Sequence, residues 1–398
     1  MSSGPGVDEA LDGVVVEGSI IICCGSGGVG KTTTAAAFAL QAARLGRRAC
    51  VVTIDPARRL ANSLGLDTLN NRPTRIEGPW PGELHALMLD PKGTFDDLIQ
   101  RYSDSAQQVE EIKVNRIYRN LTGSLSGTQE YMAMEKLYEL VEEGAFDVVV
   151  VDTPPTRNAL DFLDAPRRLT RFLENRVFQA LMKPTRAGLK FMGVAAQALL
   201  RTISRVAGAD IVHDAVAFFQ AFEGMEEGFR TRAARVRELL VQADTAFILV
   251  ASPRPDSVDE AVHFAGKLAE SDMAVTALVV NRVQPRFADD AELALLTRSA
   301  SGSGSESVDG GSVDGGSVDG GSGTPLDQLI DNLRGYTDAS DREEKALADL
   351  VSKVSPAPVY RVPLLNTDVH DLDGLETIAD LLFSGPAAAV TSRVDTER

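Results

Sequence analysis

One glycine-rich octapeptide, GSGGVGKT at residues 25–32, constrains the fold of this 398-residue chain more than any other stretch. It matches the pattern G-x-x-x-x-G-K-[ST], in which a loop joins a buried strand to a helix. The residues before it, 20–24, form the apolar run IIICC, and an alanine-rich stretch follows until Gly46. A strand, a glycine loop and a strong helix former in this order predict a phosphate-binding loop rather than an ordinary glycine-rich turn.

The residue types of this loop suit the binding of a nucleotide. Glycines allow backbone conformations that side chains would forbid, so that successive N–H groups can face one anion. Lys31 supplies a point charge for the β- and γ-phosphates, and the hydroxyl of Thr32 suits Mg²⁺. The predicted phosphate-binding residues are Gly25, Ser26, Gly27, Gly28, Val29, Gly30, Lys31, Thr32 and Thr33.

The composition excludes several classes of protein. An apolar content of 44% and a charged content of 24% are typical of a globular protein with an ample core. A net charge of −17 argues against a nucleic-acid-binding protein, which needs a basic surface. No run reaches the length of a transmembrane helix, and the acidic, polar N-terminus is unlike a signal peptide. We therefore expect a cytoplasmic protein.

Apolar segments alternate with helical ones along most of the chain. Near-continuous Val, Ile and Leu strands in this arrangement indicate an α/β fold with a doubly wound, mainly parallel sheet, as in P-loop NTPases. The predicted strands are residues 14–24, 47–55, 83–90, 146–155, 245–252, 275–283 and 359–365.

Two regions depart from the alternation. Residues 94–144 and 157–240 hold no clear strand, so we expect them to form a helical insertion subdomain. Residues 299–324 contain SVDGG three times, a composition that predicts a disordered linker; the spacing does not match known calcium loops. The expected organisation is a flexible tail at 1–13, an ATPase domain at 14–385 that holds both insertions, and a flexible tail at 386–398.

Four motifs in order resemble the arsenical-pump, or anion-transporting, ATPase family. This family of deviant Walker A P-loop NTPases includes the dimeric ATPases that target tail-anchored membrane proteins. The resemblance covers most of residues 14–383 outside the repeat. The motifs are GSGGVGKTT, TIDPARRLANSLG (53–65), VVDTPPT (150–156) and VPLLNTDV (362–369).

The resemblance implies roles for individual residues around ATP and Mg²⁺. Asp55 matches the acidic residue of the first switch, which orients the attacking water. Asp152 looks like the carboxylate of the second switch on the Mg²⁺ side, acting directly or through water, beside Thr32. Asn281 corresponds to the position that reads adenine, and Pro363 to the motif beside the base. For the two aspartates the competing interpretation is loop capping.

The sequence departs from the family pattern in four places. Ser26 replaces the signature lysine that reaches the partner's nucleotide, residues 155–158 read PTRN rather than PTGH, and Pro253 is followed by Arg254 rather than glutamate. The C-x-x-C zinc clamp is absent, so no zinc is expected. A short neutral serine cannot deliver charge across a dimer. We therefore expect a heterodimer with a paralogous ATPase that keeps the lysine, or a homodimer in which Arg157 or Arg254 compensates.

The helical insertion contains a strongly basic stretch at residues 165–205, with nine arginines and lysines against the single acidic residue Glu174. Apolar residues recur there at helical spacing. Such a surface suits a hydrophobic or membrane-protein client, or an anionic membrane surface that the protein contacts peripherally. The competing interpretation is a helical subdomain packed on its own core.

Three functions remain open from the sequence. The first is a Mg-dependent, ATP-hydrolysing dimer that couples switch movements to such a client. The second is the energising ATPase of an anion exporter of the arsenite type. Cys23, Cys24 and Cys50 argue against arsenite, because neighbours on a strand point to opposite faces and cannot converge on a soft ion. The third is a weakly hydrolysing regulatory subunit of a heterodimer.

Overall fold

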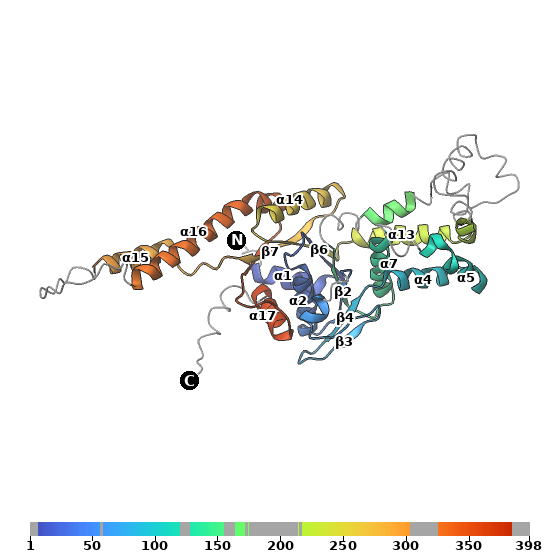
Figure 1. The fold of residues 1–398 in the computed structure, drawn as a ribbon, viewed down its shortest axis with the longest axis horizontal. Helices are drawn as coiled ribbons and strands as arrows, with labels where there is room; N and C mark the ends of the chain where they lie inside the picture. The colour runs from blue at the N-terminus through green and yellow to red at the C-terminus, as the bar shows by residue number, and fades with distance from the viewer. Residues whose placement is uncertain are drawn as a thin grey trace, which may run out of the picture.

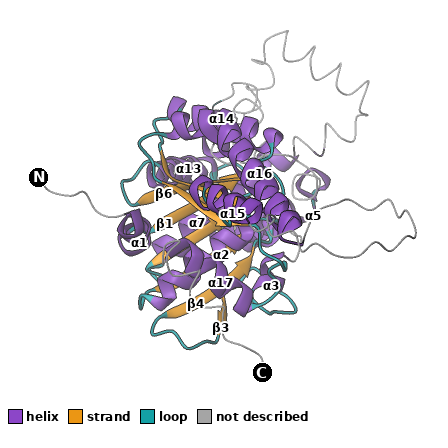
Figure 2. Cartoon of the chain, turned by 90° about the vertical axis from the view of Figure 1, so that its left-hand side faces the viewer, coloured by secondary structure: helices purple, strands orange, loops and turns teal. Residues whose placement is uncertain are grey.

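The computed structural model describes residues 7–55, 59–119, 128–154, 164–171, 174, 214, 217–302 and 325–383. Within these residues the chain forms an eight-stranded sheet in the order β3-β4-β2-β5-β1-β6-β7-β8 (Figure 1). Neighbouring strands run parallel except β3 and β4, which are antiparallel. Helices cover both faces of the sheet (Figure 2). The predicted α/β class with a mainly parallel, doubly wound sheet is confirmed.

Every predicted strand forms, most of them somewhat shorter than expected. The strands are β1 (Ile20–Gly25), β2 (Arg48–Thr53), β3 (Thr74–Ile76), β4 (Glu83–Met88), β5 (Val148–Asp152), β6 (Thr245–Ala251), β7 (Val275–Val283) and β8 (Val359–Pro363). Strand β3 was not predicted, because this edge strand has only three residues and no apolar run.

The described helices connect these strands and extend beyond them. They are α1 (Val7–Glu17), α2 (Lys31–Arg44), α3 (Arg59–Ser63), α4 (Pro91–Tyr102), α5 (Ala106–Val114), α7 (Thr128–Glu142), α13 (Glu226–Leu240), α14 (Pro255–Glu270), α15 (Asp290–Gly302), α16 (Pro325–Val354) and α17 (Leu372–Phe383).

The apolar run of β1 is explained by its central position in the sheet. Successive side chains of a strand point to opposite faces, and both faces are covered here. Ile21 and Cys23 lie in the core formed with α2 and α17. Ile22 and Cys24 lie in the core formed with α7, α14 and α16. The alanines of α2 are small, which lets this helix pack closely against the sheet below the phosphate loop.

A separate core holds the helices at one end of the molecule together. Helices α4, α5, α7 and α13 lie there (Figure 1, right). Phe95, Ile99, Tyr118 and Phe229 are buried in this core, and the rings of Phe95 and Tyr118 lie 5.5 Å apart. The described parts of residues 94–144 and 157–240 therefore form a helical body with its own packing.

A second helical extension lies at the opposite end. Helices α15 and α16 pack against each other and project beyond the sheet (Figure 1, left). Leu347 and Leu350 anchor the C-terminal half of α16 in the core. The hairpin connection contains the SVDGG repeat, which lies outside the described residues. Residues 299–302 of the predicted linker belong to α15.

The N-terminal prediction was wrong in part. Residues 7–13, expected in a flexible tail, belong to α1, and the strand expected over 14–24 begins only at Ile20. Leu11 and Val15 are fully buried against the core. Their spacing of four residues places them on one face of a helix, so α1 docks on α2 and α17 instead of moving freely.

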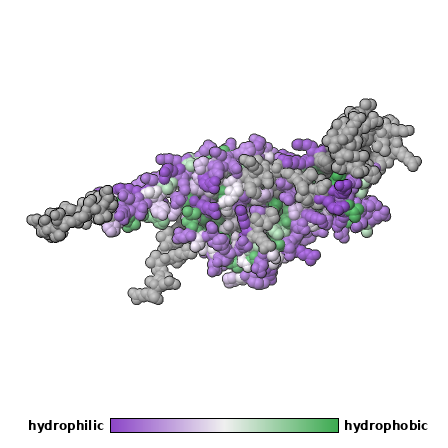
Figure 3. Space-filling model, in the orientation of Figure 1, coloured by the Kyte–Doolittle hydropathy of each residue, from purple (hydrophilic) through white to green (hydrophobic). Residues whose placement is uncertain are grey.

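The face of the molecule that Figure 3 draws is mostly hydrophilic, with small, separate apolar areas. Among the described helices, none is both long enough and apolar enough to cross a membrane.

Candidate functional site

The octapeptide loop leaves β1 at the centre of the sheet and enters α2. Its backbone requires glycine at two positions. A Cβ atom on Gly25 would lie 2.0 Å from the carbonyl oxygen of Val250, and one on Gly30 would lie 2.2 Å from Nδ2 of Asn281. Gly30 also has φ 97° at the start of α2, a conformation that side chains disfavour. These contacts fix the shape of the loop.

Lys31 is almost fully buried at the first position of α2. Its Nζ donates a 2.8 Å hydrogen bond to the carbonyl oxygen of Ser26, so the side chain folds back along the loop. Burial lowers the pKa of the Lys31 amine, and the nearby carboxylate of Asp152 opposes this shift. The amine therefore lies where a phosphate cradled by the loop would be contacted.

Asp152 ends β5 beside the loop and is 1% exposed. Its Oδ2 accepts hydrogen bonds from the hydroxyls of Thr32 and Thr53, at 2.8 and 2.9 Å. Its Oδ1 is buried and has no hydrogen-bond partner among the described residues. Burial raises the pKa of this carboxyl to about 6. An oxygen without a partner beside a threonine hydroxyl is a donor set that suits a hard cation such as Mg²⁺.

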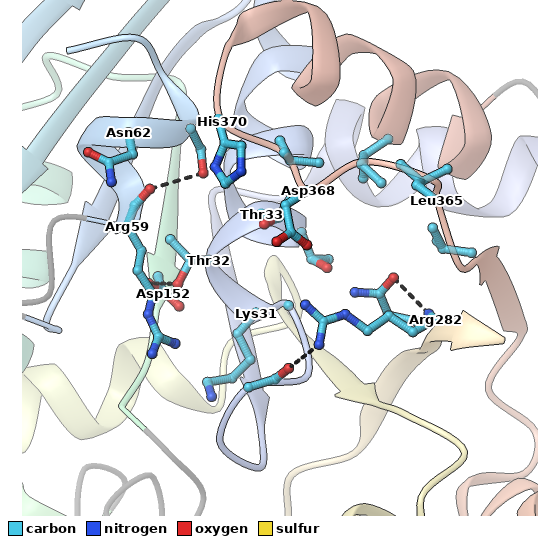
Figure 4. Close-up of a pocket in the computed structure, with 18 of the residues that line it drawn as sticks. Lys31, Thr32, Thr33, Arg59, Asn62, Asp152, Arg282, Leu365, Asp368 and His370 are labelled. Atoms are coloured by element: carbon cyan, nitrogen blue, oxygen red, sulfur yellow. Dashed lines mark hydrogen bonds between the residues drawn. The ribbon is translucent and has the colours of Figure 1, made fainter.

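A cavity of about 670 Å³ brings most of the predicted site residues together. Figure 4 shows side chains from α2, α3, β5, the end of β7 and the segment after β8 converging on it. The predicted residues that line it are Gly27, Gly28, Gly30, Lys31, Thr32, Thr33, Asp55, Asp152, Asn281 and Pro363.

Asp55 enters this cavity from the end of β2. Its backbone N–H donates a 3.3 Å hydrogen bond to the hydroxyl of Thr53, which in turn is bonded to Asp152. The two aspartates thus follow neighbouring strands and are linked through one threonine. This arrangement agrees with the rule that ligands of open α/β sheets lie at the carboxyl ends of the strands.

The side chain of Asn281 is engaged with the loop. Its Nδ2 donates to the carbonyl oxygen of Val29 at 2.8 Å, and its Oδ1 accepts from the backbone N–H of Arg282 at 2.9 Å. One N–H and one lone pair of the amide remain for a base. Asn281 therefore holds the loop in position, in addition to the base-reading role that the resemblance implies.

Ser26 does not face this cavity. Its hydroxyl donates a 3.0 Å hydrogen bond to Oγ of Ser257, which also accepts from the backbone N–H of Ser252. Ser26, Val29 and Arg254 line a second cavity of about 420 Å³ on the other side of the loop. Arg254 is ion-paired there with Asp256 at 2.7 Å. Residues 155–158, including Arg157, lie outside the described residues.

Several residues in the larger cavity were not predicted. Arg59 and Asn62 come from α3, Arg282 from β7, and Asp368 and His370 from the segment after β8. Four of these five lie in or directly beside the motifs TIDPARRLANSLG and VPLLNTDV. The polar residues within those motifs could have been predicted to line the site. Nothing in the local sequence indicates that Arg282 lies at the loop.

The cysteines do not form a soft-metal site. Cys23 lies in the core on one face of the sheet, whereas Cys24 and Cys50 lie in the core on the other. All three are free and buried, and burial raises the pKa of each thiol, that of Cys50 to about 12. Protonated thiols on opposite faces cannot act together as thiolate ligands.

The fold and the loop define a P-loop nucleotide-binding protein of the doubly wound α/β class. Residues 18–300 match the model of the anion-transporting ATPases. The chain therefore belongs to the anion-transporting ATPase family, as the resemblance predicted, and so to a family of P-loop ATPases.

Curated relatives agree with this assignment. An ATPase get3 of Aspergillus terreus is 30% identical over 42% of this chain and 49% of its own length. An uncharacterised protein of Streptomyces coelicolor is 32% identical over 67% and 62%, respectively. A protein of Aquifex aeolicus named as an arsenical pump-driving ATPase is 23% identical over 92% and 78%. The chain thus spans about half the length of the first relative and 62% of the second.

Proposed function

We propose that the protein is a Mg-dependent ATPase that binds ATP in the 670 Å³ cavity and hydrolyses it there. The observation that carries this proposal is the convergence of the phosphate loop, Asp55 and Asp152 on one cavity at the centre of the sheet. Phosphoryl transfer to water needs little covalent chemistry from a protein. It needs a phosphate cradle, a cation site and a group that orients water, and we assign these roles to the loop, to Thr32 with Asp152, and to Asp55.

Each residue has a distinct part in this proposal. The loop N–H groups and Lys31 hold the β- and γ-phosphates, and Lys31 exchanges its bond to the Ser26 carbonyl for one to phosphate. Asp55 orients the water that attacks the γ-phosphate. Pro363 and the remaining donor and acceptor of Asn281 contact the adenine base. A role for Asp55 in the transition state, rather than in binding, distinguishes it from Lys31.

Thr32 and Asp152 are the residues that would hold Mg²⁺. The buried Oδ1 of Asp152 without a partner supports this assignment, directly or through water. Mg²⁺ bound there would neutralise charge that develops on the phosphate oxygens. Asp152 also accepts hydrogen bonds from Thr32 and Thr53, which keeps its carboxylate oriented toward the loop.

We further propose that the protein works as a dimer. The favoured partner is a paralogous subunit that carries the signature lysine. The position of Ser26 supports such a partner. Ser26 is short, neutral, 5% exposed and bonded to Ser257 within its own subunit, so it cannot supply a charge to the other subunit. Arg254, an alternative cation, is paired with Asp256. The same features favour a second candidate function, a regulatory subunit with weak hydrolysis of its own.

The helical subdomain is the proposed site of a hydrophobic or membrane-protein client, or of peripheral contact with an anionic membrane. Its described helices already share a core around Phe95 and Phe229. Most of the basic stretch 165–205 lies outside the described residues. Hydrogen exchange across this stretch with and without ATP tests the proposal, because a client surface would change protection with nucleotide and a packed subdomain would not.

One assay separates the candidate functions. Phosphate release is measured for the purified chain alone, with a lysine-bearing paralogue, and with oxyanions. The proposed function predicts Mg-dependent release that the paralogue stimulates. Release that stays negligible with every paralogue, despite ATP binding, would favour the regulatory subunit. Stimulation by an oxyanion would favour the energising subunit of an anion exporter, which the buried cysteines support least for arsenite.

A further inference from the structure

Arg282 has an unusual backbone at the end of β7. Its φ is 63°, in the left-handed region, and Asp272 is the other non-glycine residue with positive φ in the described part of the chain. The pairing of β7 with β8 shifts in register between Asn281 and Val283, at this same place. Strained non-glycine residues of this kind concentrate at ligand sites, where surrounding contacts hold them.

Those contacts connect Arg282 to the phosphate loop. Its backbone N–H donates to Oδ1 of Asn281, whose Nδ2 holds the carbonyl of Val29. The guanidinium Nη1 donates to the carbonyl oxygen of Gly28 at 3.3 Å. The end of β7 therefore forms hydrogen bonds with two successive residues of the loop.

The guanidinium lies at the rim of both cavities beside the loop. Figure 4 shows it near Lys31, on the side away from Arg59. The bond to Gly28 occupies one donor of a planar group that has several more. A guanidinium keeps its charge at any physiological pH and matches phosphate oxygens in pairs. It is therefore suited to contact phosphates that the loop N–H groups cradle.

The loop is short of positive charge at the position where the family pattern has lysine. Ser26 is neutral and turned toward Ser257. Arg254 lies on the far side of the loop and is bound to Asp256. Arg282, in contrast, donates a hydrogen bond directly to a residue of the loop.

We propose that Arg282 is a phosphate-contacting cation of this site, which supplies positive charge to the chain's own nucleotide from within the same subunit. The inference rests on the proposed nucleotide function and adds a binding residue to it. Because the charge comes from β7 of the same chain, it acts on the chain's own nucleotide before any partner binds. Its contribution is to the affinity for ATP and ADP, whose β-phosphate lies in the loop.

Two substitutions with the same backbone strain separate charge from simple positioning. Arg282→Gln removes the charge but keeps a polar side chain, whereas Arg282→Lys keeps the charge. Calorimetry of the purified full chain measures the Kd of Mg·ATP and of ADP. We expect Arg282→Gln to weaken both about 10-fold or more, as charge-assisted bonds do, and Arg282→Lys to restore most of the loss.

Arg286→Gln is the matched control, because it removes an equal charge four residues further along the chain from an arginine that is already paired with Asp290 and Asp341. We expect it to change the Kd less than about 2-fold. Equal affinity in wild type and Arg282→Gln would overturn the inference, as would equal losses in Arg282→Gln and Arg282→Lys. If the wild-type chain binds no ATP, the proposed function itself fails, and this outcome is distinct from both.

Discussion

Thr32 and Asp152 lie 120 residues apart in the sequence and are joined by a 2.8 Å hydrogen bond between Oγ1 and Oδ2. The bond links the first turn of α2 to the end of β5, so the phosphate loop and the second aspartate are held as one unit. The parallel pairing of β1 with β5 in register, with Cys23 opposite Asp152, positions both partners. The site is thus a consequence of strand order.

The first prediction concerns Asp152. Asp152→Asn removes the negative charge and replaces one carboxylate oxygen by an amide nitrogen, which is a poor ligand for Mg²⁺. We expect the dependence of phosphate release on Mg²⁺ to shift to at least about 10-fold higher concentration. Thr53→Val is the control, since it removes a hydrogen bond to Asp152 but leaves both carboxylate oxygens. An unchanged Mg²⁺ titration for Asp152→Asn would show that this carboxylate is structural.

The second prediction concerns Asp55. Asp55→Asn should retain ATP affinity within a few-fold while phosphate release falls by about 10²-fold or more, because the orientation of water matters in the transition state. Binding is measured by calorimetry and release in single-turnover experiments. Hydrolysis at the wild-type rate would reduce Asp55 to a capping residue of the loop after β2.

The third prediction concerns the missing lysine. If charge from a partner limits turnover, Ser26→Lys should raise phosphate release by the purified chain, since a lysine in trans can contribute several orders of magnitude in the most favourable cases. Ser26→Lys also breaks the bond to Ser257. Ser257→Ala, which breaks the same bond without adding charge, is therefore the control. No gain over both wild type and control would mean that the charge does not limit turnover.

The fourth prediction concerns the helical subdomain. Arg232 on α13 donates from Nε to Glu135 on α7 at 2.6 Å, and both side chains are buried. Glu135→Leu leaves the arginine with the partly exposed Glu142 as its partner, so we expect the free energy of unfolding to fall by about 2 kcal/mol. The double variant Glu135→Leu/Arg232→Met should recover much of the loss. Denaturant unfolding of the three proteins measures this, and equal stability of wild type and Glu135→Leu would contradict it.

The sequence predicted the sheet well because buried parallel strands are continuous apolar runs, as in β1 and β5. It predicted the loop, Asp55 and Asp152 because each directly follows such a run. It failed for α1, because the residues that contact the core there, including Leu11, Val14 and Val15, cannot be distinguished from a polar tail without the helices that receive them. Local pattern is weak wherever tertiary contacts decide the structure.

The role of Arg282 also could not be predicted from the sequence. Its position depends on a left-handed backbone and on a shift in the pairing of β7 with β8, neither of which has a local signal. The orientation of the Ser26 hydroxyl, away from the larger cavity, likewise depends on its bond to Ser257, which is 231 residues away in the chain. Contacts across such separations become visible only in the folded molecule.

The binding of Mg·ATP by Lys31→Ala shows whether the phosphate loop is the nucleotide site of this protein. Lys31 is the lysine of the loop, and its amine bonds to the Ser26 carbonyl, so the folding of the variant is verified before its binding is interpreted. Calorimetry and phosphate release are measured on the wild type and the variant, with circular dichroism to verify folding. We expect a folded variant that has lost nearly all affinity or turnover. A folded Lys31→Ala variant that binds and hydrolyses ATP like the wild type would contradict this expectation.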